Sequence, residues 1–102
     1  MTESAALVLK WLETARADLL AIVDYISDDN PDAAQRLKDE VEAKAAKLPG
    51  QPQIYRAGRV FGTREMVVRS NYIVVYADDG GDVTILRVLH AARQWPMTAT
   101  GR

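Results

Sequence analysis

The second half of the chain contains three short apolar runs separated by polar breaks. Residues 65–69, 72–77 and 83–90 are rich in Val, Ile and Tyr, and the breaks between them contain Ser, Asn, Asp and Gly. Runs of this kind, bounded by turn residues, predict β-strands joined by hairpins. Within residues 72–76 both alternating faces are apolar. This pattern predicts a central strand that is covered on both sides or paired at an interface.

The first half of the chain shows the three- and four-residue spacing of amphipathic helices. Thr14 is the expected N-cap of a first helix that continues to residue 27, and Asn30, followed by Pro31, is the expected N-cap of a second helix. A Pro-Gly pair at residues 49–50 ends the second helix. A short polar loop separates the two, so we expect an antiparallel hairpin. The apolar stripes are Ala15, Leu19, Ile22, Val23 and Ile26, and then Ala34, Leu37, Val41, Ala45 and Leu48.

A further strand is expected at residues 7–11, so the predicted element order is β-α-α-β-β-β. This order predicts an α+β fold in which the helical hairpin packs on one face of a small, mainly antiparallel sheet. The chain has 102 residues, a length typical of one domain. We expect that domain to span residues 1–96. Residues 97–102 lack periodicity and are expected to be a frayed tail.

The composition narrows the cellular context. The chain has no cysteine, which excludes disulfides and thiolate chemistry and fits a reducing compartment. No apolar stretch approaches the ~18 residues that a membrane-spanning helix needs. The first six residues show no basic region before an apolar run, so a secretory signal is not expected. We therefore expect a cytoplasmic protein.

Charge is unevenly distributed along the chain. Residues 1–50 carry six Lys/Arg and ten Asp/Glu (6 − 10 = −4), whereas residues 51–102 carry seven Arg and four Asp/Glu (7 − 4 = +3). Arginine has a planar fork that matches carboxylates and phosphates, and it keeps its charge when partly buried. The arginine bias favours an ordered interface, with scattered surface charge as the alternative. Because the first half is acidic, we expect a protein partner and no direct, specific contact with nucleic acid.

His90 is the only histidine and therefore the first candidate for a general acid or base. A structural role at a strand end is the alternative. The acidic clusters at residues 28–32 and 78–82 lack the spacing of a calcium loop and are explained by helix capping and hairpin turns. One histidine without cysteines is also a thin set of ligands. The sequence predicts no metal and no cofactor.

Four segments of the chain follow one another in a characteristic order. They are TARADL at 14–19 with Ile22, Tyr25 and Ile26, then RxxGTRE at 59–65, NYIVVY at 71–76, and ILRVLH at 85–90 followed by Arg93. In this order they resemble toxins of the RelE/ParE superfamily, and more closely those of its ParE branch, over residues 7–96. The resemblance implies a small bacterial toxin held inactive by an antitoxin encoded beside it, here ParD-like. It also implies that DNA gyrase is the target, whereas related toxins of similar fold are ribosome-dependent mRNA endonucleases.

One position in the central strand distinguishes the gyrase-directed toxins from the ribonucleases. The resemblance implies that the ribonucleases carry an arginine there, which can stabilise the charge of a transferring phosphate. This chain has Ile73 at that position. Glu65 is the only acid/base candidate on the preceding strand. If the protein is a nuclease, its catalytic residues are expected to be His90, Arg93 and Glu65. Phe61 is a further departure, because many relatives have proline there.

Three hypotheses follow: a non-enzymatic inhibitor of gyrase, an mRNA endonuclease, and a degenerate toxin that only binds its antitoxin. The first is the leading hypothesis: Ile73 argues against the second, and nothing in the sequence separates the first from the third. We expect the arginines of the second half to face acidic antitoxin side chains in the complex and the target in the free toxin. The expected target-binding residues are Arg59, Arg64, Arg69, Arg87, His90, Arg93 and Trp95. The expected antitoxin-binding residues are Leu12, Leu19, Leu37, Val41, Arg59 and Arg64.

Overall fold

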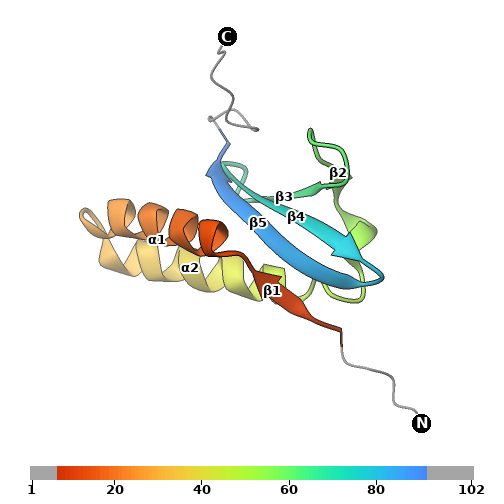
Figure 1. Cartoon of the computed structure of the whole chain (residues 1–102). Helices are drawn as coiled ribbons and strands as arrows, with labels where there is room; N and C mark the ends of the chain where they lie inside the picture. Colours follow the sequence, from red (N-terminus) through yellow and green to blue (C-terminus); the bar gives the residue numbers. More distant parts are fainter. Residues whose placement is uncertain (1–6, 92–102) are drawn as a thin grey trace.

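The computed structural model describes residues 7–91 and shows two helices packed on one sheet (Figure 1). The expected α+β class is therefore confirmed. Arg93 and Trp95, and the tail expected at residues 97–102, lie outside the described residues. The elements are β1 (Leu9–Trp11), α1 (Glu13–Ser27), α2 (Pro31–Ala46), the 3-10 turn η1 (Pro52–Ile54), β2 (Arg56–Ala57), β3 (Arg64–Val68), β4 (Tyr72–Asp79) and β5 (Asp82–His90).

The sheet has five strands in the order β1-β5-β4-β3-β2. The meander β3-β4-β5 is antiparallel, as predicted, and β1 pairs in parallel with β5. The β4–β5 register shifts between Val75 and Tyr76, which marks a bulge. The two-residue strand β2 at the far edge was not predicted. It lies in a glycine- and proline-rich segment, and only its pairing with β3 defines it as a strand.

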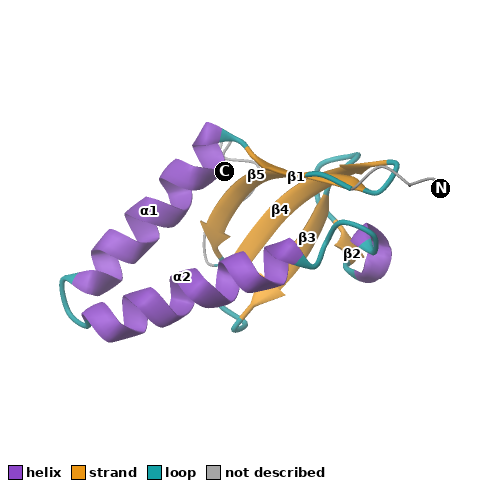
Figure 2. Ribbon diagram, turned by 90° about the horizontal axis from the view of Figure 1, so that it is seen from below, coloured by secondary structure: helices purple, strands orange, loops and turns teal. Residues whose placement is uncertain are grey.

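The helical hairpin covers one face of the sheet, and its tip extends beyond the strands (Figure 2). The cap expected at Asn30 is confirmed, since its side-chain oxygen accepts a hydrogen bond from the backbone N–H of Ala33 at 3.0 Å. The cap expected at Thr14 is wrong. Leu12 occupies the N-cap position without a side-chain cap, and the Thr14 hydroxyl donates to the carbonyl of Leu86 at 3.1 Å.

The main core lies between the helical hairpin and the sheet, and β4 buries side chains on both faces of the sheet. Val74 and Tyr76 pack toward the helices, in the main cluster. Ile73 and Val75 belong to a second, smaller cluster with Leu89. All four β4 residues are at most 5% exposed. The expectation of a central strand that is apolar on both faces is therefore confirmed. Within residues 7–91 no helix combines the length and apolar character needed to cross a membrane.

Candidate functional site

A cavity of about 570 Å³ lies between α1 and the end of β5. We call it the α1–β5 groove. It contains two of the predicted target-binding residues, Arg87 and His90, and is otherwise mainly apolar and aromatic. Its remaining lining residues are Asp18, Ala21, Ile22, Tyr25, Ile26, Tyr72, Val88 and Leu89.

An ion pair forms one wall of the α1–β5 groove. Arg87 donates from Nε to Oδ2 of Asp18 at 2.7 Å and from Nη2 to Oδ1 at 3.1 Å. The backbone N–H of Val88 donates to the same Asp18 carboxylate at 3.0 Å. The hydrogen bond to Asp18 raises the pKa of Arg87 above its ordinary value. β1 pairs with β5 only as far as Ile85. Beyond that point the Asp18 side chain of α1, rather than a strand, accepts the hydrogen bond from the β5 backbone.

His90 lies at the exposed end of β5, against an aromatic ring. The rings of His90 and Tyr72 are 5.3 Å apart between centroids and meet edge-on at 79°. The two residues are direct partners in the β4–β5 register. The groove therefore gathers a histidine, an arginine and two tyrosines. Sequence reasoning missed Asp18, Tyr25 and Tyr72 as groove residues, because their side-chain neighbours come from distant parts of the chain.

Glu65 is the buried charged residue of the described structure and organises the start of β3. Its side chain is 2% exposed and accepts a hydrogen bond from Nη2 of Arg56 at 3.0 Å and one from the backbone N–H of Arg59 at 3.1 Å. Arg64, beside it, donates to the carbonyl of Tyr55 at 2.8 Å. Arg59 and Arg64 thus lie together at the β2–β3 loop, which we define as residues 58–63.

The described arginines do not form one continuous surface. Arg59 and Arg64 lie at the start of β3, whereas Arg69 follows its other end, in the turn to β4. Arg69 pairs there with Glu40 of α2 at 2.6 Å. Arg87 lies in the α1–β5 groove, three strands away from β2. These four arginines therefore occupy three separate places, and only Arg59 and Arg64 share one.

The conditional catalytic residues are also separated. Glu65 lies on β3 and His90 on β5, with β4 between them. Two strand spacings correspond to roughly 10 Å, well beyond hydrogen-bond reach. The buried Glu65 carboxylate is already engaged by Arg56 and Arg59. These two residues do not form an acid–base pair, and Arg93 lies outside the described residues.

Two of the residues expected to bind the antitoxin, Leu37 and Val41, are buried in the core. Leu37 and Val41 are 1% exposed and Leu19 is 5% exposed, because the apolar stripes of both helices point into the main core. Leu37 and Val41 therefore offer no surface to a partner. Leu12 is 39% exposed. A hollow of about 340 Å³ does lie over the hairpin, lined by Trp11, Leu19 and Leu20 together with Arg16, Lys38 and Glu42.

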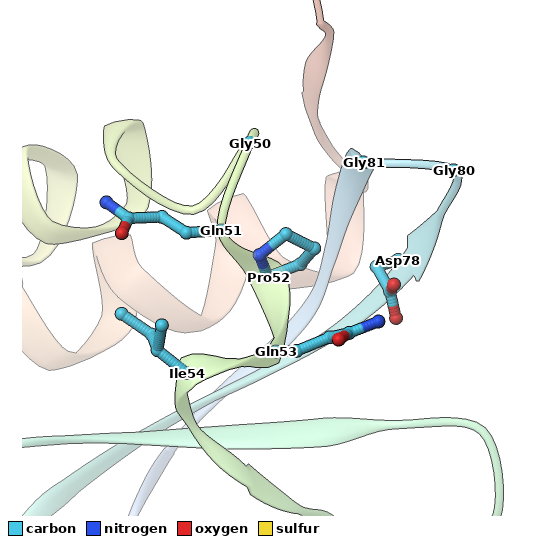
Figure 3. Close-up of a pocket in the computed structure, with 8 residues that line it drawn as sticks. All are labelled: Gly50, Gln51, Pro52, Gln53, Ile54, Asp78, Gly80 and Gly81. Atoms are coloured by element: carbon cyan, nitrogen blue, oxygen red, sulfur yellow. The ribbon is translucent and has the colours of Figure 1, made fainter.

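A further hollow, of about 370 Å³, lies between η1 and the β4–β5 turn (Figure 3). The side chains of Gln53 and Asp78 extend toward one another across it. None of the other labelled residues has a charged side chain. It includes no residue expected to bind a target or an antitoxin. Among the described residues, no group of three or more His, Cys, Asp and Glu is arranged to hold a metal ion.

The chain matches the family model described as ParE toxin of type II toxin-antitoxin system, parDE, over residues 9–95. It therefore belongs to the ParE toxin family, within the broader RelE/ParE group, and is the toxin component of a type II toxin-antitoxin system.

Two relatives agree with this assignment. A candidate toxin of Sinorhizobium fredii, Y4kP, is 38% identical over 89 residues, which cover 86% of this chain and 92% of the relative. The toxin RelE2 of Caulobacter vibrioides is 40% identical over 83 residues, which cover 81% and 93%.

Solved structures share the fold. The chromosomal ParDE system of P. aeruginosa matches with a TM-score of 0.73 and 23% identity, covering 82% of this chain and 95% of that one. The toxin-antitoxin complex RelBE2 of Mycobacterium tuberculosis matches with a TM-score of 0.54 and 25% identity, covering 86% and 94%. Both are described as toxin-antitoxin systems.

Proposed function

We propose that this protein inhibits DNA gyrase by a protein–protein contact, without catalysis, and that a ParD-like antitoxin neutralises it in the cytoplasm. The observation that carries this proposal is the apolar second cluster on the sheet face opposite the helices. Ile73, at 5% exposure, packs there with Val75 and Leu89. An isoleucine side chain cannot neutralise a transferring phosphate, which a ribonuclease site needs.

The charged groups near this face give further support. Glu65 is buried and bonded to Arg56 and Arg59, so it is poorly placed to exchange protons with a substrate. Three arginines, Arg64, Arg69 and Arg87, are anchored to carbonyls or carboxylates at separate places. Such anchored guanidinium groups suit contacts with a folded partner, where Arg is a frequent hot-spot residue.

An mRNA endonuclease is the second candidate, and one observation favours it. Arg87, His90 and Tyr72 line the same α1–β5 groove, so a cation and a titratable group do lie near one another. A nuclease of this kind would use His90 for proton transfer, and its loss would reduce the rate by ~10²–10⁴-fold.

The test compares both activities of one preparation. Purified toxin is incubated with DNA gyrase, ATP and supercoiled plasmid, and separately with mRNA on programmed ribosomes. We expect linear plasmid trapped by gyrase and intact mRNA. His90→Ala should alter gyrase trapping only through its effect on stability or on contact with gyrase. Site-specific mRNA cleavage that His90→Ala abolishes, in a variant that still folds, would establish the nuclease instead. A toxin without either activity that still binds its antitoxin would be a degenerate member.

The antitoxin is proposed to cover the hollow over the hairpin. Leu20 is 55% exposed there, beside Trp11, and an apolar antitoxin segment that orders on binding could bury both. Leu20→Arg should therefore abolish neutralisation by co-expressed antitoxin. Asp24→Arg, at an exposed position on the same helix outside the hollow, is the control and should remain neutralised.

A further inference from the structure

Phe61 stands at the tip of the β2–β3 loop with its whole side chain in solvent. Its relative exposure is 102%, the highest among the exposed large apolar residues of the described chain. Figure 1 shows this connection standing out from the sheet at the β2 end. An aromatic ring gains free energy when it leaves water, so a fully exposed phenylalanine is unfavourable in the free protein. Core packing does not explain its position.

The loop that carries Phe61 is held by a set of internal hydrogen bonds. The N–H of Gly58 donates to the carbonyl of Thr63 at 2.8 Å, and Thr63 donates from its N–H and its hydroxyl to the carbonyl of Val60 at 3.0 and 2.6 Å. A Cβ atom at Gly58 would lie 2.2 Å from Oγ1 of Thr63, so this close approach requires glycine. The buried Glu65 carboxylate accepts a hydrogen bond from the backbone N–H of Arg59 and so ties the loop to β3.

A loop that is already ordered loses little conformational entropy on binding. The tip of the loop is therefore suited to present the Phe61 side chain to a partner. Gly62, which follows Phe61, has φ of 85° and completes the turn. An exposed ring on a loop with this many internal bonds has the character of a binding hot spot.

The surroundings of Phe61 are positively charged. Residues 53–65 contain three arginines and one acid, Glu65, giving 3 − 1 = +2. Glu65 is buried, whereas the Arg56 side chain is 57% exposed and Arg59 is exposed. A complementary partner surface would combine an apolar pocket with carboxylates at its rim.

We propose that Phe61 is the anchor by which this toxin docks into a carboxylate-rimmed apolar pocket of its target protein. This inference rests on the proposed function in taking that target to be gyrase. A single-stranded nucleic acid fits less well, because such sites stack successive bases on several aromatic rings and this loop offers one. The antitoxin also fits less well, because the hollow proposed for it lies by β1, at the opposite edge of the sheet from β2.

The test is a comparison of Phe61→Ala with Ile54→Ala, which removes another exposed apolar side chain, at 59% exposure, from η1. Neither side chain packs in the core, so both variants should fold like the wild type. We expect Phe61→Ala to weaken binding to the gyrase holoenzyme by about 30-fold or more, as at an aromatic hot spot, and to relieve growth arrest. Ile54→Ala should do neither. Both variants should bind the co-expressed antitoxin as tightly as the wild type.

A charge test adds a second readout. Arg59→Ala should slow association with gyrase and make it less sensitive to salt, whereas Lys47→Ala, at an exposed position after α2, should leave both unchanged.

The outcomes separate this inference from the proposed function. If the wild type does not bind gyrase but Phe61→Ala still relieves growth arrest, the loop inference holds and gyrase is the wrong target. If the wild type binds gyrase and Phe61→Ala binds it equally well, the loop inference is wrong and the proposed function stands. Selective loss of antitoxin binding, or of binding to a single-stranded oligonucleotide, would also overturn the inference.

Discussion

The carboxylate of Asp18 on α1 accepts two hydrogen bonds from Arg87 on β5 and a third from the backbone of the next residue, Val88. One helical side chain therefore satisfies both a cation and a strand-edge N–H. This contact ties α1 of the hairpin to β5 of the sheet and forms one wall of the α1–β5 groove.

Removing the Asp18 carboxylate should destabilise the fold. The Asp18 and Arg87 side chains are 18% and 29% exposed, and Asp18→Ala removes the acceptor of two guanidinium hydrogen bonds and of the Val88 N–H. We expect the free energy of unfolding, measured by urea denaturation, to fall by about 2 kcal/mol. Asp24→Ala, at an exposed position on the same helix, should change it by less than about 0.5 kcal/mol. Equal effects of the two substitutions would rule out a special role for the Asp18–Arg87 pair.

Glu65 should be important for stability and for order in the β2–β3 loop. Glu65→Gln preserves its shape but removes the charge that Arg56 and the N–H of Arg59 recognise. We expect a loss of about 2 kcal/mol in the free energy of unfolding and faster hydrogen exchange of the Arg59 amide. The matched control is Glu40→Gln, which breaks the more exposed pair with Arg69 and should cost about 0–1 kcal/mol. An unchanged Arg59 exchange rate would contradict this account.

The β3–β4 turn should be improved by glycine. Arg69 and Ser70 have φ of 58° and 64°, a conformation that side chains adopt with strain. Ser70→Gly should raise the thermal stability, with a gain of about 1 kcal/mol. Gly80 in the β4–β5 turn has φ of 65° and open space around it, so Gly80→Ala should lose a similar amount through backbone strain alone. Calorimetry of the two variants measures both signs, and a destabilising Ser70→Gly would show that the strain is absent.

Tyr76 should make the fold sensitive to alkaline pH. Burial raises the pKa of Tyr76 from 10.0 to about 12, and its hydroxyl donates to the carbonyl of Pro52. Above about pH 10 the unfolded chain releases this proton while the folded chain keeps it, so stability is complete below pH 10 and declines up to about pH 12. Tyr76→Phe should be less stable at neutral pH but show a smaller alkaline decline in urea titrations. Tyr25→Phe, at an exposed ring, should decline as the wild type does.

Much of the secondary structure was predictable because its signals are local. The three apolar runs became β3, β4 and β5, and Asn30 with Pro31 defined the start of α2. The prediction of an N-cap at Thr14 was wrong because the pairing of β1 with β5 extends to Leu12, whose N–H donates to the carbonyl of Ile85. The helix therefore begins one residue after Leu12, and the Thr14 hydroxyl is used on β5 instead. The family could likewise be recognised from the order of short segments, because that order is read from the sequence without any knowledge of contacts.

The location of each functional side chain could not be predicted in this way, because burial depends on neighbours that are distant along the chain. Periodicity placed Leu37 and Val41 on one stripe, but only packing against the sheet showed that this stripe is core rather than partner surface. Arg87 binds Asp18, which lies 69 positions away in the sequence. Glu65 accepts a hydrogen bond from Arg59, in a segment for which the sequence pattern predicted no helix or strand. Long-range contacts of this kind decided which arginines are anchored and that Phe61 is left fully in solvent.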